Sequence, residues 1–403
     1  MHIKPKHIAL FGNFGSDNLG NEASLKAMID FLRRERPDAE LTCVCYGVES
    51  AQSAFGLATL PITPSFPRDR WFKTLNRWLL KIPFQLRDFF HALRHVRKFD
   101  VLIVPGTGIL DDFSERWQGM PYDLFKWGLA AIVMRRPFAF VSVGAGPIHH
   151  WLSRWLMKSA ARLARYRSFR DELSKDYMVA LGAAKESDPI FPDLVFSLPT
   201  PEQSARKTPG DGITTIGVGV MHYYGWDRHS PARPQIHETY IASMSQFICW
   251  VLEHGYHIRL LLGAQSDRKS YPEILARVTA KCGAAAAQAM LAEPAASFDA
   301  LMRQIAETDL VVTTRFHNIV AALKLGRPAI SLGYARKNDV LLEKFGLGSY
   351  CQPVEHIDVP TLISQFESLV QTAGLYPARL EETAEDFRRC LEEQNAFLLE
   401  NLL

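Results

Sequence analysis

The sequence predicts an α/β protein built from two successive Rossmann-like domains, each with a parallel sheet, that face one another across a cleft. Apolar runs of strand length alternate with helical patterns along the chain, and this alternation indicates βαβ units and parallel sheets. The chain has 403 residues, a length that suits two domains. The stretch 199–212 is polar and rich in Pro and Gly, as expected of a linker between them.

The first domain is expected over residues 1–205. It opens with a buried strand at 7–12, followed by a glycine-containing loop and a helix from about residue 21 to 36, which has apolar residues on one face. Further strands are predicted at 40–46, 100–104, 137–143 and 167–169, and another element closes near 192–196. A strand, a helix and a second strand at the start of the chain predict a parallel sheet.

The second domain is expected over residues 206–377. Strands are predicted at 213–220, 257–263, 309–313 and 327–332, and helices at 237–254, 270–282 and 317–325. A last helical pattern covers residues 378–403, and we expect it to pack back on the N-terminal domain.

Composition limits the class of protein. The net charge is +3, but residues 1–200 hold 27 Lys and Arg against 20 Asp and Glu, which suits an anionic ligand or membrane surface. Six scattered cysteines predict core thiols in a reducing cytoplasm and no disulfide framework. No apolar run reaches the roughly 20 residues that span a bilayer. We therefore expect a cytoplasmic protein, with peripheral contact to the inner membrane face as an option.

Glycine-containing loops follow three predicted strands of the first domain. The first loop includes Asn18 and Gly20 and leads to Glu22 at the start of a helix; the second includes Gly106, Gly108 and Asp111; the third includes Gly144 and Gly146. Because ligands bind at the carboxyl ends of parallel strands, we expect backbone amides of these loops to approach a ligand. Tight turns with helix-capping side chains are the structural alternative.

Two arginines follow strands of the predicted sheets. Arg170 comes directly after the strand at 167–169, and an ion pair with Asp171 or Glu172 is its structural alternative. Arg315 and His317 follow the strand at 309–313 and precede a helical pattern. A guanidinium and an imidazole at a strand end suit an anionic substrate and a proton transfer.

Aromatic residues mark two further regions. The loop 222–229 carries His222, Tyr223, Tyr224 and Trp226, which could stack on a sugar or base or pack at the surface. The stretches 68–98 and 149–167 mix Trp and Phe with Arg and Lys; they fit anionic membrane surfaces or amphipathic helices packed on the sheet. We find no nucleic-acid-binding motif and no spaced set of metal ligands.

Taken in order, these motifs resemble those of the polysaccharide pyruvyl transferases. Asn18-Leu19-Gly20-Asn21-Glu22 is similar to the family's N-L-G-D-E, and the segment 106–111 to G-G-G-x-L-x-D. The loop 144–147 looks like the family's G-x-G-I-G-P, and the segment 170–174 looks like R-D-x-x-S. Pro192-Asp193 looks like an acidic motif of the family. Arg315-Phe316-His317 resembles R-L-H, and Tyr334 and Lys337 fall where the family has Y-x-x-K.

The resemblance implies a GT-B-like fold and transfer of pyruvate from phosphoenolpyruvate to a sugar, with formation of a cyclic ketal. It implies that Arg315 and Arg170 bind the donor with help from loop amides and Lys337. His317 is the candidate acid, and Glu22 or Asp111 the candidate base. No cofactor or metal is expected. The acceptor is expected to be a saccharide of a surface-polysaccharide precursor, carried on a lipid or a nucleotide.

Three alternatives remain open from the sequence. A GT-B glycosyltransferase would bind a nucleotide sugar near residues 217–229 and 263–268. A nucleotide-sugar epimerase of similar architecture is the second, and a non-catalytic glycan-binding or glycan-assembly protein is the third.

Overall fold

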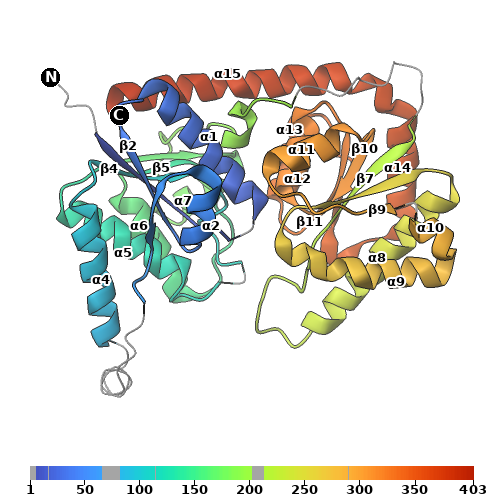
Figure 1. Cartoon of the computed structure of the whole chain (residues 1–403), viewed down its shortest axis with the longest axis horizontal. Helices are drawn as coiled ribbons and strands as arrows, with labels where there is room; N and C mark the ends of the chain where they lie inside the picture. Colours follow the sequence, from blue (N-terminus) through green and yellow to red (C-terminus); the bar gives the residue numbers. More distant parts are fainter. Residues whose placement is uncertain (1–5, 17, 66–81, 114, 202–212, 289) are drawn as a thin grey trace. The chain divides into compact units, whose positions relative to one another are not determined.

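A computed structural model describes residues 6–16, 18–65, 82–113, 115–201, 213–288 and 290–403 (Figure 1). Its contacts divide the chain into two compact units. Unit 1 comprises Met1–Ser16, Ser24–Leu194 and Leu391–Leu403; unit 2 comprises Asp17–Ala23 and Val195–Cys390. The division between the long segments lies between Leu194 and Val195, whereas the sequence placed it at 205/206.

Unit 1 contains a parallel six-stranded sheet in the order β3-β2-β1-β4-β5-β6. The strands are β1 (His7–Phe11), β2 (Glu40–Cys45), β3 (Ala58–Pro61), β4 (Val101–Pro105), β5 (Phe138–Val143) and β6 (Tyr166–Phe169). The helices are α1 (Leu19–Glu35), whose first turn belongs to unit 2, α2 (Val48–Phe55), α4 (Ile82–Val96), α5 (Met120–Val133), α6 (Trp151–Leu163) and α7 (Glu172–Ala180). The strand order reverses between β1 and β4, which makes their carboxyl ends the expected place for a ligand.

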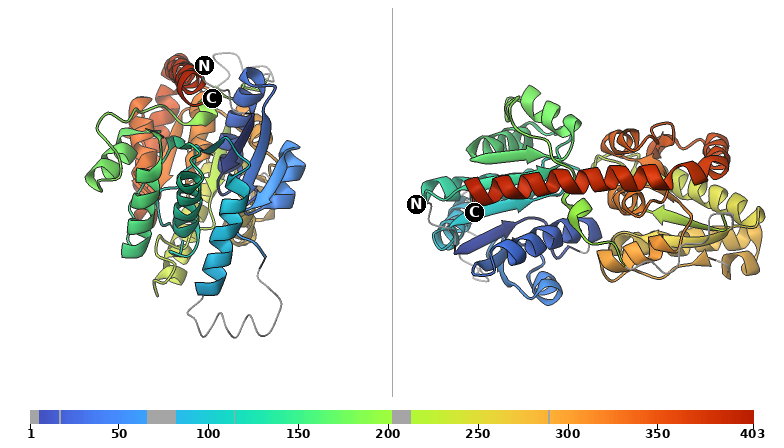
Figure 2. Two further views of the ribbon diagram at one scale, coloured as in Figure 1. Left: turned by 90° about the vertical axis from the view of Figure 1, so that its left-hand side faces the viewer. Right: turned by 90° about the horizontal axis from the view of Figure 1, so that it is seen from above.

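Unit 2 repeats this arrangement with the order β12-β11-β10-β7-β8-β9. Its strands are β7 (Thr215–Val220), β8 (His257–Leu262), β9 (Met290–Leu291), β10 (Leu310–Thr313), β11 (Ala329–Gly333) and β12 (Cys351–Pro353). Its helices are α8 (Arg233–Glu253), α9 (Ser270–Cys282), α10 (Ala284–Gln288), α11 (Phe298–Ala306), α12 (Phe316–Lys324), α13 (Lys337–Lys344), α14 (Val359–Thr372) and α15 (Pro377–Asn401), which ends in unit 1. The strand order reverses between β7 and β10. Two parallel sheets with helices on both faces (Figure 2) confirm the predicted fold class.

Burial explains which strands the sequence could predict. Every residue of β4 and β10 is buried, so both strands read as continuous apolar runs, as central parallel strands do. The edge strands β3, β9 and β12 have two to four residues and mixed burial, and the sequence analysis missed them. The element predicted near 192–196 is a 3-10 helix, η1 (Leu194–Ser197).

The end of α15 packs against the sheet of unit 1. The buried Gln394 side chain accepts a hydrogen bond from Ser168 Oγ at 2.7 Å and donates one to Ser142 Oγ at 2.9 Å. Ser142 has φ +50° and lies where the register of β5 and β6 shifts. The terminal helix thus satisfies the hydroxyl groups beside a bulge that precedes Gly144. Among the described residues, no helix has both the length and the apolar character needed to cross a membrane.

A buried lysine in unit 2 makes the stability of the fold depend on pH. Lys324 Nζ donates to the carbonyl oxygen of Phe196 at 2.7 Å. Burial, helped by the charge of Arg388, lowers the pKa of Lys324 from 10.5 to about 8. Between these two values the unfolded chain binds more protons than the folded chain, so stability rises with pH across this window.

We expect Lys324→Met to remove this dependence. The free energy of unfolding of the wild type should rise by up to about 3 kcal/mol relative to that of the variant between pH 7.5 and 10.5. Urea unfolding at several pH values measures the difference, with the exposed Lys344→Met as the control. Parallel pH profiles of wild type and Lys324→Met would contradict the lowered pKa.

Candidate functional site

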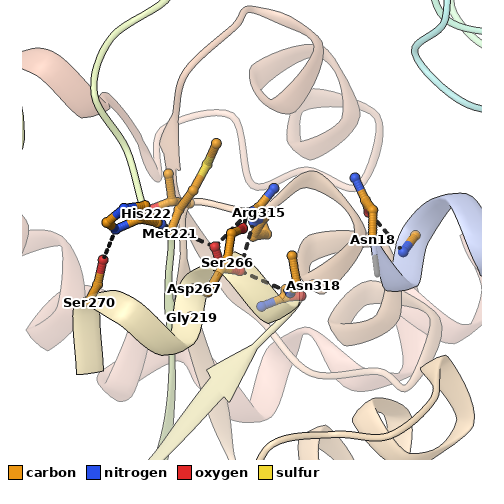
Figure 3. Close-up of polar contacts among 12 residues, drawn as sticks. Asn18, Gly219, Met221, His222, Ser266, Asp267, Ser270, Arg315 and Asn318 are labelled. Carbon is orange, nitrogen blue, oxygen red and sulfur yellow. Dashed lines mark hydrogen bonds and ion pairs between the residues drawn. The ribbon is translucent and has the colours of Figure 1, made fainter. Parts of the chain in front are cut away.

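Arg315 is held by an aspartate that the sequence analysis did not single out. It follows β10, and its Nε and Nη2 donate to the two carboxylate oxygens of Asp267 at 3.0 and 2.5 Å (Figure 3). Asp267 lies in the 3-10 helix η2 (Gln265–Lys269) after β8 and is fully buried. Two parallel hydrogen bonds fix the plane of the guanidinium as well as its charge.

The same carboxylate fixes two neighbouring loops. Asp267 Oδ2 accepts the amide hydrogen of Ala264 at 3.0 Å, and Oδ1 accepts that of His222 at 3.1 Å. The ends of β7, β8 and β10 are therefore joined through one side chain.

The ion pair determines which part of Arg315 can bind a ligand. Burial works to lower the pKa of Arg315, but the Asp267 carboxylate outweighs it and raises that pKa, so the guanidinium stays charged. Asp267 occupies the edge formed by Nε and Nη2. Within the part of the chain that the structure describes, Nη1 makes no hydrogen bond, and it is the group left for an anion.

The predicted loop residues Asn18 and Gly20 lie beside His317 in unit 2. Asn18 pairs with Ala264 in an isolated bridge, and its side chain accepts the amide hydrogen of Gly20 at 3.1 Å. A Cβ atom on Gly20 would lie 1.9 Å from His317 Nδ1, so the imidazole occupies the space that a side chain would fill. Glu22 follows in the first turn of α1. The structure thus brings Gly20 into contact with the candidate acid, and Asn18 and Glu22 lie two residues before and after it along the chain.

The two remaining glycine loops pair with each other in unit 1. Leu110 and Ala145 form a parallel bridge, and the amide of Gly144 donates to the carbonyl oxygen of Thr107 at 2.7 Å. Thr107 has φ +67°, next to Gly106 with φ +58°. The loop with Gly106, Gly108 and Asp111 therefore lies against the loop with Gly144 and Gly146. Asp111 Oδ1 accepts the amide hydrogen of Phe113 at 3.2 Å; this bond closes a local turn and caps no helix, because the next helix, α5, begins at Met120.

Arg170 is a buried member of an ion-pair cluster. Its Nη1 donates to Asp193 Oδ2 at 3.1 Å, and its Nε lies 3.5 Å from Asp171 Oδ2. The side chain is only 3% exposed and fills the space beside Gly144, whose Cβ would lie 2.6 Å from Nε. The structural alternative, an ion pair with Asp171, is therefore present together with a stronger contact to Asp193. Binding of a substrate by Arg170 stays a prediction.

The aromatic loop and Lys337 come together in unit 2. The rings of Trp226 and Tyr334 are 6.5 Å apart, and Lys337 Nζ lies 4.8 Å from the centre of the Tyr334 ring. A separate pocket of about 70 Å³ lies at the carboxyl end of β8. The residues that line it include Leu19, Ala264 and Arg268.

The predicted site residues thus form two groups. Unit 1 holds Gly106, Gly108, Asp111, Gly144, Gly146 and Arg170; unit 2 holds Asn18, Gly20, Glu22, Arg315, His317 and Lys337. Each group lies at carboxyl ends of parallel strands, which in such sheets is where ligands bind.

Fold and site together define an α/β protein of the GT-B class with positively charged side chains at its strand ends. Solved structures agree on the fold. Anabaena HepE with UDP and glucose is 14% identical over 99% of this chain and 100% of its own, with a TM-score of 0.61. S. aureus MnaA with UDP is 12% identical over 99% and 98%, with a TM-score of 0.59. UDP-GlcNAc 2-epimerase from Neisseria meningitidis is 10% identical over 96% and 99%, with a TM-score of 0.57.

The sequence gives the family. The model of the polysaccharide pyruvyl transferase family matches residues 18–336, and the chain belongs to that family. A comparison with curated proteins found no match. The family predicted from the motifs is confirmed, and the matched span contains every predicted site residue except Lys337.

The contact between Gly20 and His317 leads to a test of the site geometry. We expect Gly20→Ala to destabilise the protein by about 1–3 kcal/mol, because the new methyl group must displace the imidazole or the loop. Gly374→Ala is the matched control, since a Cβ there meets nothing within 4 Å. Denaturant midpoints measure both changes. Equal midpoints for the two variants would show that the loop does not lie against His317.

Proposed function

We propose that this protein transfers a pyruvyl group from phosphoenolpyruvate to a sugar of a surface-polysaccharide precursor and closes it as a cyclic ketal. The observation that carries the proposal is the family match over residues 18–336. Pyruvyl transfer to a polysaccharide is the activity of the family. Phosphoenolpyruvate as the donor and the ketal as the product are our proposal.

The donor is a small anion with a carboxylate and a phosphate. Arg315 supports its binding because Asp267 keeps the guanidinium charged and oriented while Nη1 stays available. Arg170 is the predicted second contact, and an anion there would have to share the guanidinium with Asp193. Lys337 is the second predicted positive charge in unit 2, in addition to Arg315. None of these groups requires a cofactor.

The reaction needs an acid at the methylene carbon of the donor. Protonation of that carbon by His317 would make the adjacent carbon electrophilic, and a sugar hydroxyl would form a C–O bond to it. A second hydroxyl would then displace phosphate from the same carbon and close the ring. The two sugar hydroxyls release two protons. One restores the proton that His317 gave to the methylene carbon, and the other leaves with phosphate, so the number of protons balances.

A carboxylate is needed to accept the proton of the attacking hydroxyl. Glu22 is favoured as this base because it lies in the same unit as His317 and two residues after Gly20, which contacts the imidazole. Asp111, which lies beside Gly146 in unit 1, is the other candidate.

A nucleotide-sugar enzyme is the second candidate function. HepE and MnaA were solved with UDP bound, and the pocket lined by Ala264 and Arg268 lies in the segment 263–268, where the glycosyltransferase alternative places a nucleotide. UDP binding without phosphate release from phosphoenolpyruvate would favour this function.

Phosphate release from phosphoenolpyruvate in the presence of sugar acceptors tests the proposed reaction. We expect His317→Ala to lower kcat by about 10²- to 10⁴-fold, the usual contribution of a general acid, with little change in the denaturant midpoint. His254→Ala is the control, because this exposed histidine lies at the end of α8 opposite the site.

Two outcomes would contradict the assignment. Unchanged kcat in His317→Ala would remove this residue from the mechanism. No acceptor-dependent phosphate release by the wild type, with a panel of lipid-linked and nucleotide-linked sugars, would overturn the proposed reaction. It would leave the nucleotide-sugar enzyme and the glycan-assembly role, which UDP binding distinguishes.

We further propose that unit 1 contacts anionic membranes, as suits a lipid-linked acceptor. On α6, Trp151 and Trp155 are 71% and 53% exposed, with Arg154 exposed between them. On α4, Phe90 is 64% exposed and has Arg94 beside it on the helix surface. Exposed aromatic rings among arginines fit the interface of an anionic bilayer. The first part of the basic stretch predicted at 68–98, residues 68–81, lies outside the described residues.

We expect the protein to float with liposomes that contain anionic lipid at low salt, because both ring insertion and arginine charge favour binding. The double variant Trp151→Ser/Trp155→Ser should lose most of this binding, while Leu375→Ser, which alters a 77% exposed side chain in unit 2, should not. Absence of the wild type from the floated fraction would refute the membrane contact.

A further inference from the structure

Three potential metal ligands meet in unit 2 beside the Asp267 carboxylate. His222 follows β7, His237 lies in the second turn of α8, and Glu273 lies in the first turn of α9. One ligand atom from each side chain lies within 4.8 Å of the others. The three positions are far apart in the sequence, so no ligand spacing revealed them, and the expectation from the sequence was that no metal binds.

His237 has a hydrogen-bonding partner at each of its ring nitrogens. His237 Nδ1 lies 3.0 Å from the carbonyl oxygen of Tyr223, which can only accept, so Nδ1 carries the hydrogen. His237 Nε2 lies 3.0 and 3.2 Å from the two carboxylate oxygens of Glu273. A neutral ring would direct its Nε2 lone pair at a carboxylate. Either a second proton or a metal ion must therefore lie between them.

Both imidazoles are oriented as metal-binding histidines usually are. Such histidines bond to a fixed partner through the nitrogen that does not bind the metal. The carbonyl group of Tyr223 provides this partner for His237, and Ser270 Oγ, 3.1 Å from Nδ1, provides it for His222. The ring of Tyr224 stacks on His237 with a centre-to-centre distance of 4.1 Å, which further fixes its plane. His222 Nε2 and His237 Nε2 are thus left as the coordinating atoms.

We propose that His222, His237 and Glu273 bind one divalent transition-metal ion, with Zn²⁺ as the best match to two imidazoles and one carboxylate. Ligand atoms about 2.1 Å from a tetrahedral zinc are separated by roughly 3.4 Å, close to the spacing between His237 and Glu273. The Glu273 side chain is 43% exposed and can rotate to complete the geometry. Water would occupy the fourth position.

The position of the site gives it a structural consequence. The peptide N–H of His222 donates to Asp267, and Asp267 holds Arg315. An ion bound to the His222 ring would therefore fix one of the groups that orient the arginine. The three ligands are positioning residues for Arg315 in this arrangement. The metal site itself does not rest on the proposed reaction.

Metal binding by the full-length chain without an affinity tag tests the proposal. After treatment with a chelator, calorimetric titration with Zn²⁺ should give one ion per chain, and Co²⁺ should produce the visible absorption of a tetrahedral site. His237→Ala and His222→Ala should each weaken binding by at least about tenfold, and Ser270→Ala, which removes only the hydrogen-bond partner of His222, by roughly 10- to 100-fold. His229→Ala, an exposed histidine of the same loop, should bind as the wild type does.

A further variant separates a metal site from an ion pair. Glu273→His keeps a ligand but removes the carboxylate, so a metal site retains binding whereas a His237–Glu273 ion pair is destroyed. Retained Co²⁺ absorption in Glu273→His supports the proposal. Either of two results overturns it: no stoichiometric Zn²⁺ binding by the wild type, or binding that the histidine substitutions leave unchanged. Because these readouts do not use activity, they are independent of whether pyruvyl transfer is found.

Discussion

The arrangement of the unit 2 site depends on the ion pair between Asp267 and Arg315. A fully buried carboxylate is costly unless its oxygens are satisfied, and Asp267 meets this requirement with the guanidinium and two peptide N–H groups. These donors come from the loops after β7, β8 and β10. One side chain therefore sets the spacing of three strand ends and the orientation of the arginine that follows the third.

Unit 1 also buries a charged side chain, and a different set of groups satisfies it. Arg170 is buried with Asp193, and the two glycine loops beside it bond to each other through their backbones. Ser174, from the same motif as Arg170, accepts the amide hydrogen of Ala145 at 2.9 Å. The motif residues of unit 1 thus hold the loop after β5 in place.

The sequence was sufficient for the fold class because central parallel strands are buried on both faces and read as apolar runs. It was also sufficient to locate Arg315 and His317, because both come soon after the apolar run of β10, at the carboxyl end of that strand. It could not reveal Asp267 as their partner, because an aspartate in a short 3-10 helix has no periodicity to distinguish it. The edge strands were missed for the same reason: their short, half-buried segments carry little pattern.

The glycines show where reasoning from the sequence was incomplete. They were expected to let backbone amides approach a ligand. In the structure, the space left by a missing Cβ is filled by His317 beside Gly20 and by Arg170 beside Gly144. Glycine is required at both positions because a charged or titratable side chain, distant in sequence, must pass close to the backbone. A loop motif and an arginine or histidine motif are therefore two halves of one contact, which explains why such short motifs, weak when taken singly, specify the family when they occur together.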